Sequence, residues 1–150
     1  MKSDVSVADP HARIDQLEKR ALLSALWLFV LLNLIFRDIH EIVKAEFLTD
    51  ALNGIYNGRE VTEAMFLLGG IIVEVPVAMM LMAWILPTRA NRRANVTTAV
   101  LFALAVIATV PGDLDDYFHT GLELTALAVI IWQAWTWDRS PSSTHAPETE

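Results

Sequence analysis

The chain has 150 residues, of which 54% are hydrophobic, and its formal net charge is −7. This apolar content is high for a protein whose surface faces water, and the apolar residues cluster in four blocks, so the composition favours a small helical membrane protein. The chain contains no cysteine, which excludes disulfides, thiolate metal sites, haem thioethers and dithiol redox chemistry within it.

The first segment, residues 1–20, is polar and precedes the first apolar block. Asp9 and Pro10 are typical of an N-cap followed by proline at the first helical position. Ile14 and Leu17 then keep helical spacing among charged residues. We expect a short amphipathic helix on the cytoplasmic membrane surface that continues into the first membrane span.

Four apolar segments follow, and each can cross a bilayer as a helix of roughly 20 residues. The expected spans are 21–41, 64–86, 94–111 and 117–137. Together they form a transmembrane domain over residues 21–137, so the predicted fold is an all-α bundle of four transmembrane helices. The tail, residues 138–150, is rich in Pro, Ser and Thr and is predicted to be disordered.

An outer loop of about twenty residues joins the first two spans. Within it, an apolar stripe at helical spacing opposes charged residues over positions 44–55, which predicts a helix lying in the membrane interface. Asn53-Gly54 and Asn57-Gly58 are turn signals that bring the chain back to the second span. Within that span, Pro76 predicts a bend.

The distribution of Lys and Arg predicts the orientation of the chain. Eight of the 11 lie in the N-terminal segment, in a basic loop expected at 88–93 and in the tail. Since basic residues concentrate on the cytoplasmic side, we expect a multi-pass protein of the inner membrane with both termini in the cytoplasm. The lipid bilayer is then its first partner, a homodimer or a membrane-protein partner is a further expectation, and no nucleic acid is expected.

Ionisable residues inside the spans are the candidate functional groups, because an uncompensated charge at the bilayer centre costs at least about 2.5 kcal/mol. A rise of 1.5 Å per residue puts Arg37 and Glu123 within about one helical turn of each other in depth, which predicts an ion pair. The same estimate puts Glu74 roughly 15 Å deep, where we expect a neutral acid that hydrogen-bonds to Asn33.

These residues predict an outward-facing polar pocket with an acidic vestibule. The pocket is expected to be lined by Asn33, Arg37, His40, Glu41, Glu74, His119 and Glu123. The vestibule, an acidic loop that concentrates cations, is expected to contain Asp113, Asp115 and Asp116.

The sequence predicts neither a metal ion nor a cofactor in this pocket. Asp116 and His119 form one carboxylate-x-x-His motif, whereas a di-iron bundle needs two Glu-x-x-His motifs and two further carboxylates. A haem held by His40 and His119 is disfavoured, because histidines near helix ends are common without ligand roles. No nucleophile–base pair can be located, so the sequence leans against an enzyme without excluding one.

Four stretches carry a resemblance that covers about residues 22–136: LWLFVLLN with the following RDI, VEVPVAMMLM around Glu74, RANRRANV, and DYFHTGLEL around Glu123. On them the chain resembles a family of small, uncharacterised four-helix membrane proteins of bacteria, a domain of unknown function, and is similar in plan to the DoxX-like proteins. The resemblance implies four transmembrane helices and the bacterial cytoplasmic membrane, with no established activity. DoxX-like proteins are associated with quinone or thiol oxidation partners, and the lack of cysteine argues against a thiol role here.

Two functions therefore stay open. The first is an inner-membrane protein that binds a small ligand in the polar pocket or moves protons or cations through Glu74. The alternative is a non-catalytic membrane scaffold, or a subunit of a larger complex, whose polar residues only set helix packing.

Overall fold

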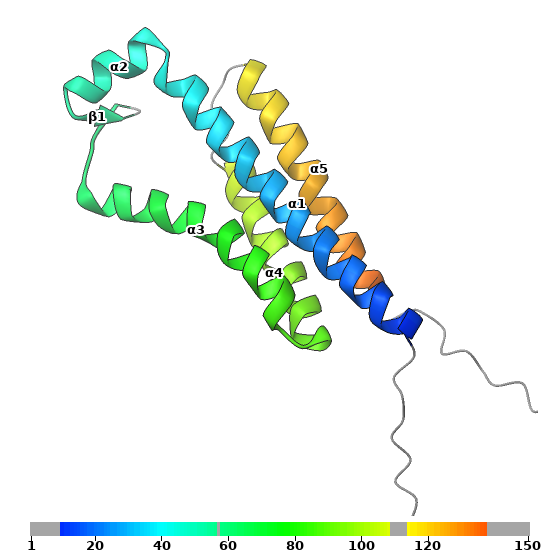
Figure 1. Cartoon of the computed structure of the whole chain (residues 1–150). Coiled ribbons are helices and arrows are strands. Elements are labelled where there is room, and N and C mark those ends of the chain that lie inside the picture. The colour runs from blue at the N-terminus through cyan, green and yellow to red at the C-terminus, as the bar shows by residue number, and fades with distance from the viewer. Residues whose placement is uncertain (1–9, 57, 109–113, 138–150) are drawn as a thin grey trace, which may run out of the picture.

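The computed structural model describes residues 10–56, 58–108 and 114–137 of the chain. Its elements are α1 (Pro10–Ile42), α2 (Ala45–Leu52), β1 (Ile55–Tyr56), β2 (Arg59–Glu60), α3 (Glu63–Ile85), α4 (Thr88–Ala108) and α5 (Leu114–Thr136) (Figure 1). The all-α prediction is confirmed, because the two strands form only a two-residue antiparallel hairpin. The expected disordered tail, Asp113 and the end of the third span lie outside the described residues.

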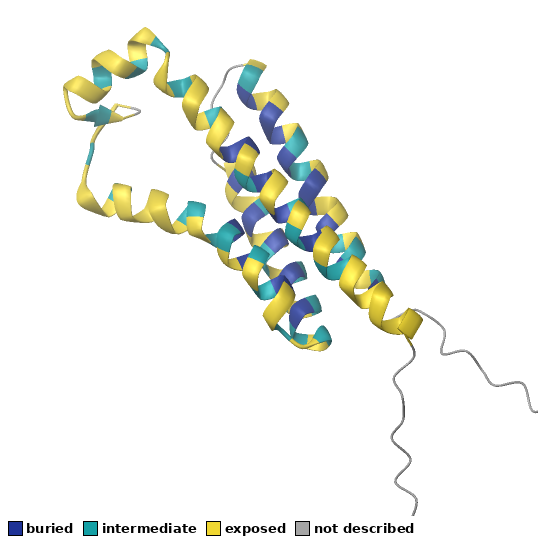
Figure 2. Ribbon diagram, viewed as in Figure 1, coloured by how far each residue is buried: buried dark blue, intermediate teal, exposed yellow. Residues whose placement is uncertain are grey.

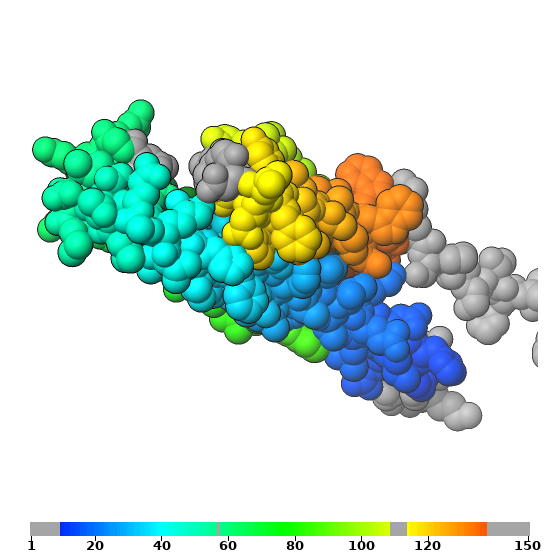
Figure 3. Space-filling model, turned by 90° about the horizontal axis from the view of Figure 1, so that it is seen from above, coloured from blue at the N-terminus to red at the C-terminus, as the bar shows by residue number. Residues whose placement is uncertain are grey.

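The four long helices alternate in direction, so the start of α1 and the end of α5 lie at the same end of the bundle (Figure 1). α1 packs against both α3 and α5, and α5 packs against α4. In the space-filling view α5, in yellow and orange, lies along α1 (Figure 3). Among the described residues, α1 and α3 are long and apolar enough to cross a membrane.

The core lies where α1, the second half of α3, α4 and α5 meet, as the dark blue residues of Figure 2 show. Trp27 of α1 is fully buried, and its ring meets Phe102 edge to face with the ring centroids 6.2 Å apart. Its indole N–H donates to Asn95 Oδ1 at 2.7 Å. The Asn95 amide donates to Asn91, and the Asn91 amide donates to the Ala83 carbonyl at 2.8 Å. This buried network satisfies the polar end of the tryptophan and ties α1, α3 and α4 together.

Arg20 closes the same end of the bundle. Its guanidinium donates to the carbonyl oxygens of Ala83, Trp84 and Leu86 at 2.9, 2.8 and 3.0 Å. The carbonyls of Ala83 and Trp84 belong to the last turn of α3 and that of Leu86 to its C-cap residue, where no intrahelical donor remains for them. A cation at a helix C-terminus is also favoured by the helix dipole. The contact therefore fixes where α3 ends against α1.

Two sequence-based boundaries are wrong. The expected basic loop at 88–93 is the start of α4, which begins at Thr88 directly after Pro87. Arginine favours helices, so the charge of this segment did not mark a loop. The last helix begins at Leu114 rather than at position 117, so Asp115 and Asp116 lie in the first turn of α5. Carboxylates are stabilised there by the helix N-terminus.

The segment between α1 and α3 contains the predicted helix, α2, and the predicted turns. Gly54 and Gly58 both have left-handed φ angles, 70° and 71°, which glycine adopts without the strain of a side chain. They flank β1, whose Tyr56 ring contacts Phe47 of α2 with a centroid distance of 6.0 Å. Every residue of α2 is exposed or half-buried, so this segment adds little to the core.

α3 is bent, and its first half stands away from the other helices (Figure 1). Pro76 lies inside it, which accounts for the bend because proline removes a helix hydrogen bond and crowds the preceding turn. The buried residues of α3 are Pro76, Met79 and Ala83, all in its second half. Apolar side chains of the first half are exposed, with Phe66 75% and Leu67 66% accessible.

Candidate functional site

Polar side chains gather on α1 and α5 near the C-terminal end of α1, where Arg37 meets Glu123, Asn33 meets His119 and His40 meets Asp115. We call this group the polar seam. Its members are Asn33, Arg37 and His40 of α1 with Asp115, His119 and Glu123 of α5, together with Asp116 and Thr120, which are buried on α5 beside them. The α1 members recur at four and three residues, so they share one helix face. The α5 members from Asp116 to Glu123 recur at three and four residues and are all buried.

The centre of the seam is an ion pair between Arg37 and Glu123. Arg37 Nη1 lies 3.4 Å from Glu123 Oε2, and the two side chains are 11% and 0% exposed. The pairing predicted from matching depths is confirmed. Glu123 Oε1 has no hydrogen-bond partner among the described residues. This oxygen of the buried carboxylate can therefore still accept a hydrogen bond.

Asn33 fixes the orientation of His119 beside this pair. The Asn33 amide N–H donates to the Phe29 carbonyl at 2.9 Å, which leaves its Oδ1 facing His119 Nδ1 at 3.3 Å. Because an amide oxygen only accepts, His119 Nδ1 must carry the proton and donate. Asn33 therefore bonds to Phe29 of α1 and to His119 of α5. The hydrogen bond expected between Asn33 and Glu74 is not formed.

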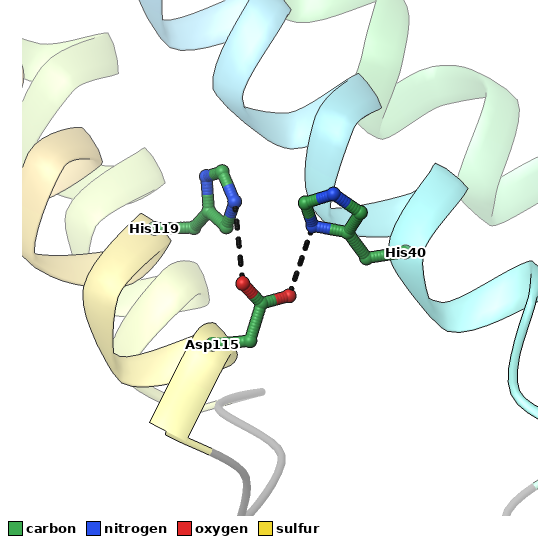
Figure 4. A group of neighbouring side chains, drawn as sticks. All are labelled: His40, Asp115 and His119. Atoms are coloured by element: carbon green, nitrogen blue, oxygen red, sulfur yellow. Dashed lines mark hydrogen bonds and ion pairs between the residues drawn. The ribbon is translucent and has the colours of Figure 1, made fainter.

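At the outer edge of the seam, Asp115 lies between two histidines (Figure 4). Asp115 Oδ2 is 3.0 Å from His40 Nδ1, and Asp115 Oδ1 is 3.7 Å from His119 Nε2. The His40 and Asp115 side chains are 52% and 41% exposed, whereas that of His119 is 9% exposed. The seam thus leads from the bundle surface to a buried ion pair.

The remaining predicted site residues lie elsewhere. The structure does not bring Glu74 to the others, since its side chain is exposed on α3 and lines an open, mostly apolar groove of about 500 Å³ with Phe66, Gly70 and Ile71. Glu41 forms an ion pair with Lys44, Nζ to Oε2 2.6 Å, at the end of α1.

Two features of the seam escaped the sequence reasoning. Thr120 is buried, and its Oγ1 and the Oδ2 of buried Asp116 have no hydrogen-bond partner among the described residues. The spacing of Asp116, Thr120 and Glu123 at four and seven residues was a signal for a polar stripe on α5. The contact of Asp115 with both histidines had no such signal, because Asp115 was expected in a loop.

A family model described as a family of unknown function (DUF6326) matches residues 14–144. The chain belongs to this family. The match spans the whole polar seam of the DUF6326 chain, so the seam is part of the family domain and not an appendage to it. Searches of curated proteins and of solved structures found no match. The function proposed for this DUF6326 protein therefore rests on its geometry.

Proposed function

We propose that the chain is a multi-pass protein of the bacterial cytoplasmic membrane in which α1, α3, α4 and α5 all cross the bilayer. Large apolar side chains exposed on α4 and α5 as well as on α3 support this, among them Leu101 at 61%, Leu104 at 60% and Trp132 at 68%. A surface of this kind is unfavourable in water and suits contact with lipid. The likeness in plan to DoxX-like proteins belongs to the same proposal.

In the proposed orientation both termini are cytoplasmic and the polar seam opens to the outside. The end of the bundle at which α1 begins and α5 ends also contains Arg20 and the start of α4, with its arginines at 89, 92 and 93. This is the side on which basic residues concentrate. Arg92 stacks over Trp135 at 5.3 Å, as expected for an aromatic belt at the membrane interface.

The proposed function is the binding of a small polar or ionic ligand in the seam, from the outside. The observation that carries it is the buried Arg37–Glu123 pair, joined through a row of polar side chains to the exposed surface. An interhelical polar contact stabilises a bundle by about 0.6 to 1.7 kcal/mol, whereas each charge inside the membrane costs at least about 2.5 kcal/mol. Helix packing alone is therefore a weak reason for this pair.

Binding is better supported than conduction through the bundle. On the cytoplasmic side of the seam, the contact between α1 and α5 is apolar and filled by Val30, Leu127 and Ile130, all buried. A proton or cation path would have to cross this layer. The route through Glu74 receives no support from the seam, because that carboxylate lies on α3 away from it.

Native mass spectrometry of the protein, extracted gently from its own membrane, tests the binding function. We expect wild-type chain with additional bound mass, and loss of that mass in the double variant Arg37→Met/Glu123→Gln, which removes both charges together. Glu74→Gln is the matched control, a carboxylate replaced outside the seam, and should retain the bound mass. Bare wild-type chain, or bound mass that the double variant keeps, contradicts the proposal.

The second candidate is a scaffold that binds another chain through α3. The exposed first half of α3 favours it, because Glu74 projects there from an otherwise apolar groove and would be costly against lipid. A second copy of this chain or another membrane protein would cover the groove.

Cysteine cross-linking in membranes tests this scaffold function, since the native chain has no cysteine. A side chain at Gly70 meets nothing within 4 Å, so Gly70→Cys is tolerated. We expect Gly70→Cys to form a cross-linked homodimer, or a cross-link to a second polypeptide, on oxidation. Leu101→Cys on exposed α4 is the control and should stay monomeric. Equal behaviour of the two variants would exclude a specific contact at this face.

A further inference from the structure

We propose that His40, Asp115 and His119 bind one divalent transition-metal ion of the zinc type at the mouth of the polar seam. Each residue offers one ligand atom, and these three atoms all lie within 4.8 Å of one another. Two imidazoles and one carboxylate are a donor set that Zn²⁺ uses when three protein ligands leave one position open. The proposal rests on the outward-facing pocket above only for the side from which the ion arrives.

The distances fit a tetrahedral site after small side-chain movements. With metal–ligand bonds of about 2.1 Å, neighbouring ligand atoms of a tetrahedron are about 3.4 Å apart. Asp115 Oδ2 lies 3.0 Å from His40 Nδ1 and Asp115 Oδ1 lies 3.7 Å from His119 Nε2, so the two contacts use different oxygens. With a single carboxylate oxygen as ligand, the three ligand atoms lie within 4.8 Å of one another, and rotations of the exposed side chains can bring them to the tetrahedral spacing. The three groups come from α1 and α5 (Figure 4), so a bound ion would cross-link the two helices.

The hydrogen bond between His119 and Asn33 is a second, independent observation that favours a metal at His119. Its Nδ1 donates to Asn33 Oδ1, and the Asn33 amide is itself oriented by its bond to the Phe29 carbonyl. With Nδ1 engaged by Asn33, Nε2 is the ring nitrogen left to bind a metal, and it lies 3.7 Å from Asp115 Oδ1. A cation between the two groups would be bound by both. A hydrogen bond from the second ring nitrogen is the usual support of a metal-binding histidine.

The surrounding charges also favour a cation. Arg37 forms an ion pair with Glu123, and Lys44 with Glu41, so both basic groups act on other carboxylates. Asp115 contacts the two histidines, which leaves one negative charge to meet a divalent ion. Because His40 and Asp115 are about half exposed, the open coordination position faces water and can take a water molecule or a ligand of the seam.

Metal titration of the full-length, untagged protein in detergent tests the proposal. After chelation and removal of the chelator, Zn²⁺ is titrated by calorimetry and Co²⁺ by its visible absorption. We expect one ion per chain, tetrahedral Co²⁺ bands and a higher melting temperature at saturation. His40→Gln and Asp115→Asn change half-exposed groups, so these variants should fold. They should lose affinity by more than the roughly 10- to 100-fold that a supporting residue contributes.

Three further variants sharpen the result. His11→Gln, at the start of α1, is the matched control and should bind like wild type. Asn33→Leu should weaken Zn²⁺ binding about 10- to 100-fold and shift the Co²⁺ bands, while Asn33→Asp, which still accepts from His119, should keep the site. A purely structural Asn33 would leave the Co²⁺ spectrum unchanged.

The absence of saturable binding, or binding that His40→Gln and Asp115→Asn retain in full, overturns the metal site. Weakening by His11→Gln does the same, because it would place the ion on other histidines. Neither result bears on the proposed ligand site, which is tested through Arg37 and Glu123 by native mass spectrometry. Failure of the metal site and failure of the binding function are therefore distinguishable.

Discussion

Removing Arg37 and Glu123 one at a time and together measures how far the buried pair stabilises the bundle. Unit charges 3.4 Å apart attract by about 5 kcal/mol at an effective dielectric constant of 20, and by about 1 kcal/mol in water. Since Glu123 is fully buried and Arg37 is 11% exposed, the attraction between the two charges is nearer to about 5 kcal/mol. The cost of removing both charges from water is then subtracted from this attraction. We expect Arg37→Met and Glu123→Gln each to destabilise by about 3 kcal/mol, with a coupling energy of about 2 to 3 kcal/mol.

The assay is equilibrium unfolding in mixed detergent–SDS micelles, followed by far-UV circular dichroism. The matched control is a second double-mutant cycle, Arg37→Met with Glu74→Gln, which pairs the same arginine with a carboxylate on the far face of α3. That cycle should be additive. Additivity of the Arg37–Glu123 cycle to within about 0.3 to 0.5 kcal/mol would refute the ion pair and the reasoning from its distance.

Three further predictions concern the contacts of Trp27 and Arg20 and the proposed topology. Trp27→Phe leaves Asn95 Oδ1 without its donor and should destabilise the protein by about 1 to 3 kcal/mol. The double variant Trp27→Phe/Asn95→Leu should cost less than the sum of the two single variants. A double variant that costs the full sum would contradict the hydrogen bond. Arg20→Met should destabilise by about 1.5 to 3 kcal/mol through its bonds to the α3 carbonyls, with partial rescue by Arg20→Lys, and an unchanged unfolding midpoint would exclude that role. Arg89 and Leu114 are both exposed, and single cysteines at these positions should react with an impermeant thiol reagent from opposite sides of the membrane. Leu114→Cys should be labelled from outside in intact cells. Labelling of both variants from one side would overturn the four-span topology.

The pairing of Arg37 with Glu123 was predictable because depth along a helix is a local property. The rise per residue is nearly constant, so two residues of antiparallel helices can be assigned equal depth from the sequence, while the packing of α1 against α5 brings them into contact. The helical nature of α2 followed in the same way from its apolar stripe, and its turns from Asn-Gly pairs.

The error at the start of α4 had a chemical cause. Three arginines were used to assign the cytoplasmic side, and the same charges were then taken to mark a loop. Arginine is a good helix former, and the buried face of Asn91 and Asn95 continues the helix through the basic segment. Charge reports the side of the membrane and does not report helix boundaries.

The sequence alone determined the helical character of the chain and the bend at Pro76, because periodicity and the missing proline N–H act within a few residues of the chain. Only the tertiary structure decided which helix faces meet. The second half of α3 packs into the core, whereas the first half, which contains Glu74, stands away and leaves that carboxylate outside the polar seam. Likewise, Asp115 meets His40 and His119 only because α5 begins at Leu114 and packs along α1. Helix rotation and contact are set by neighbours distant in sequence, which local patterns do not encode.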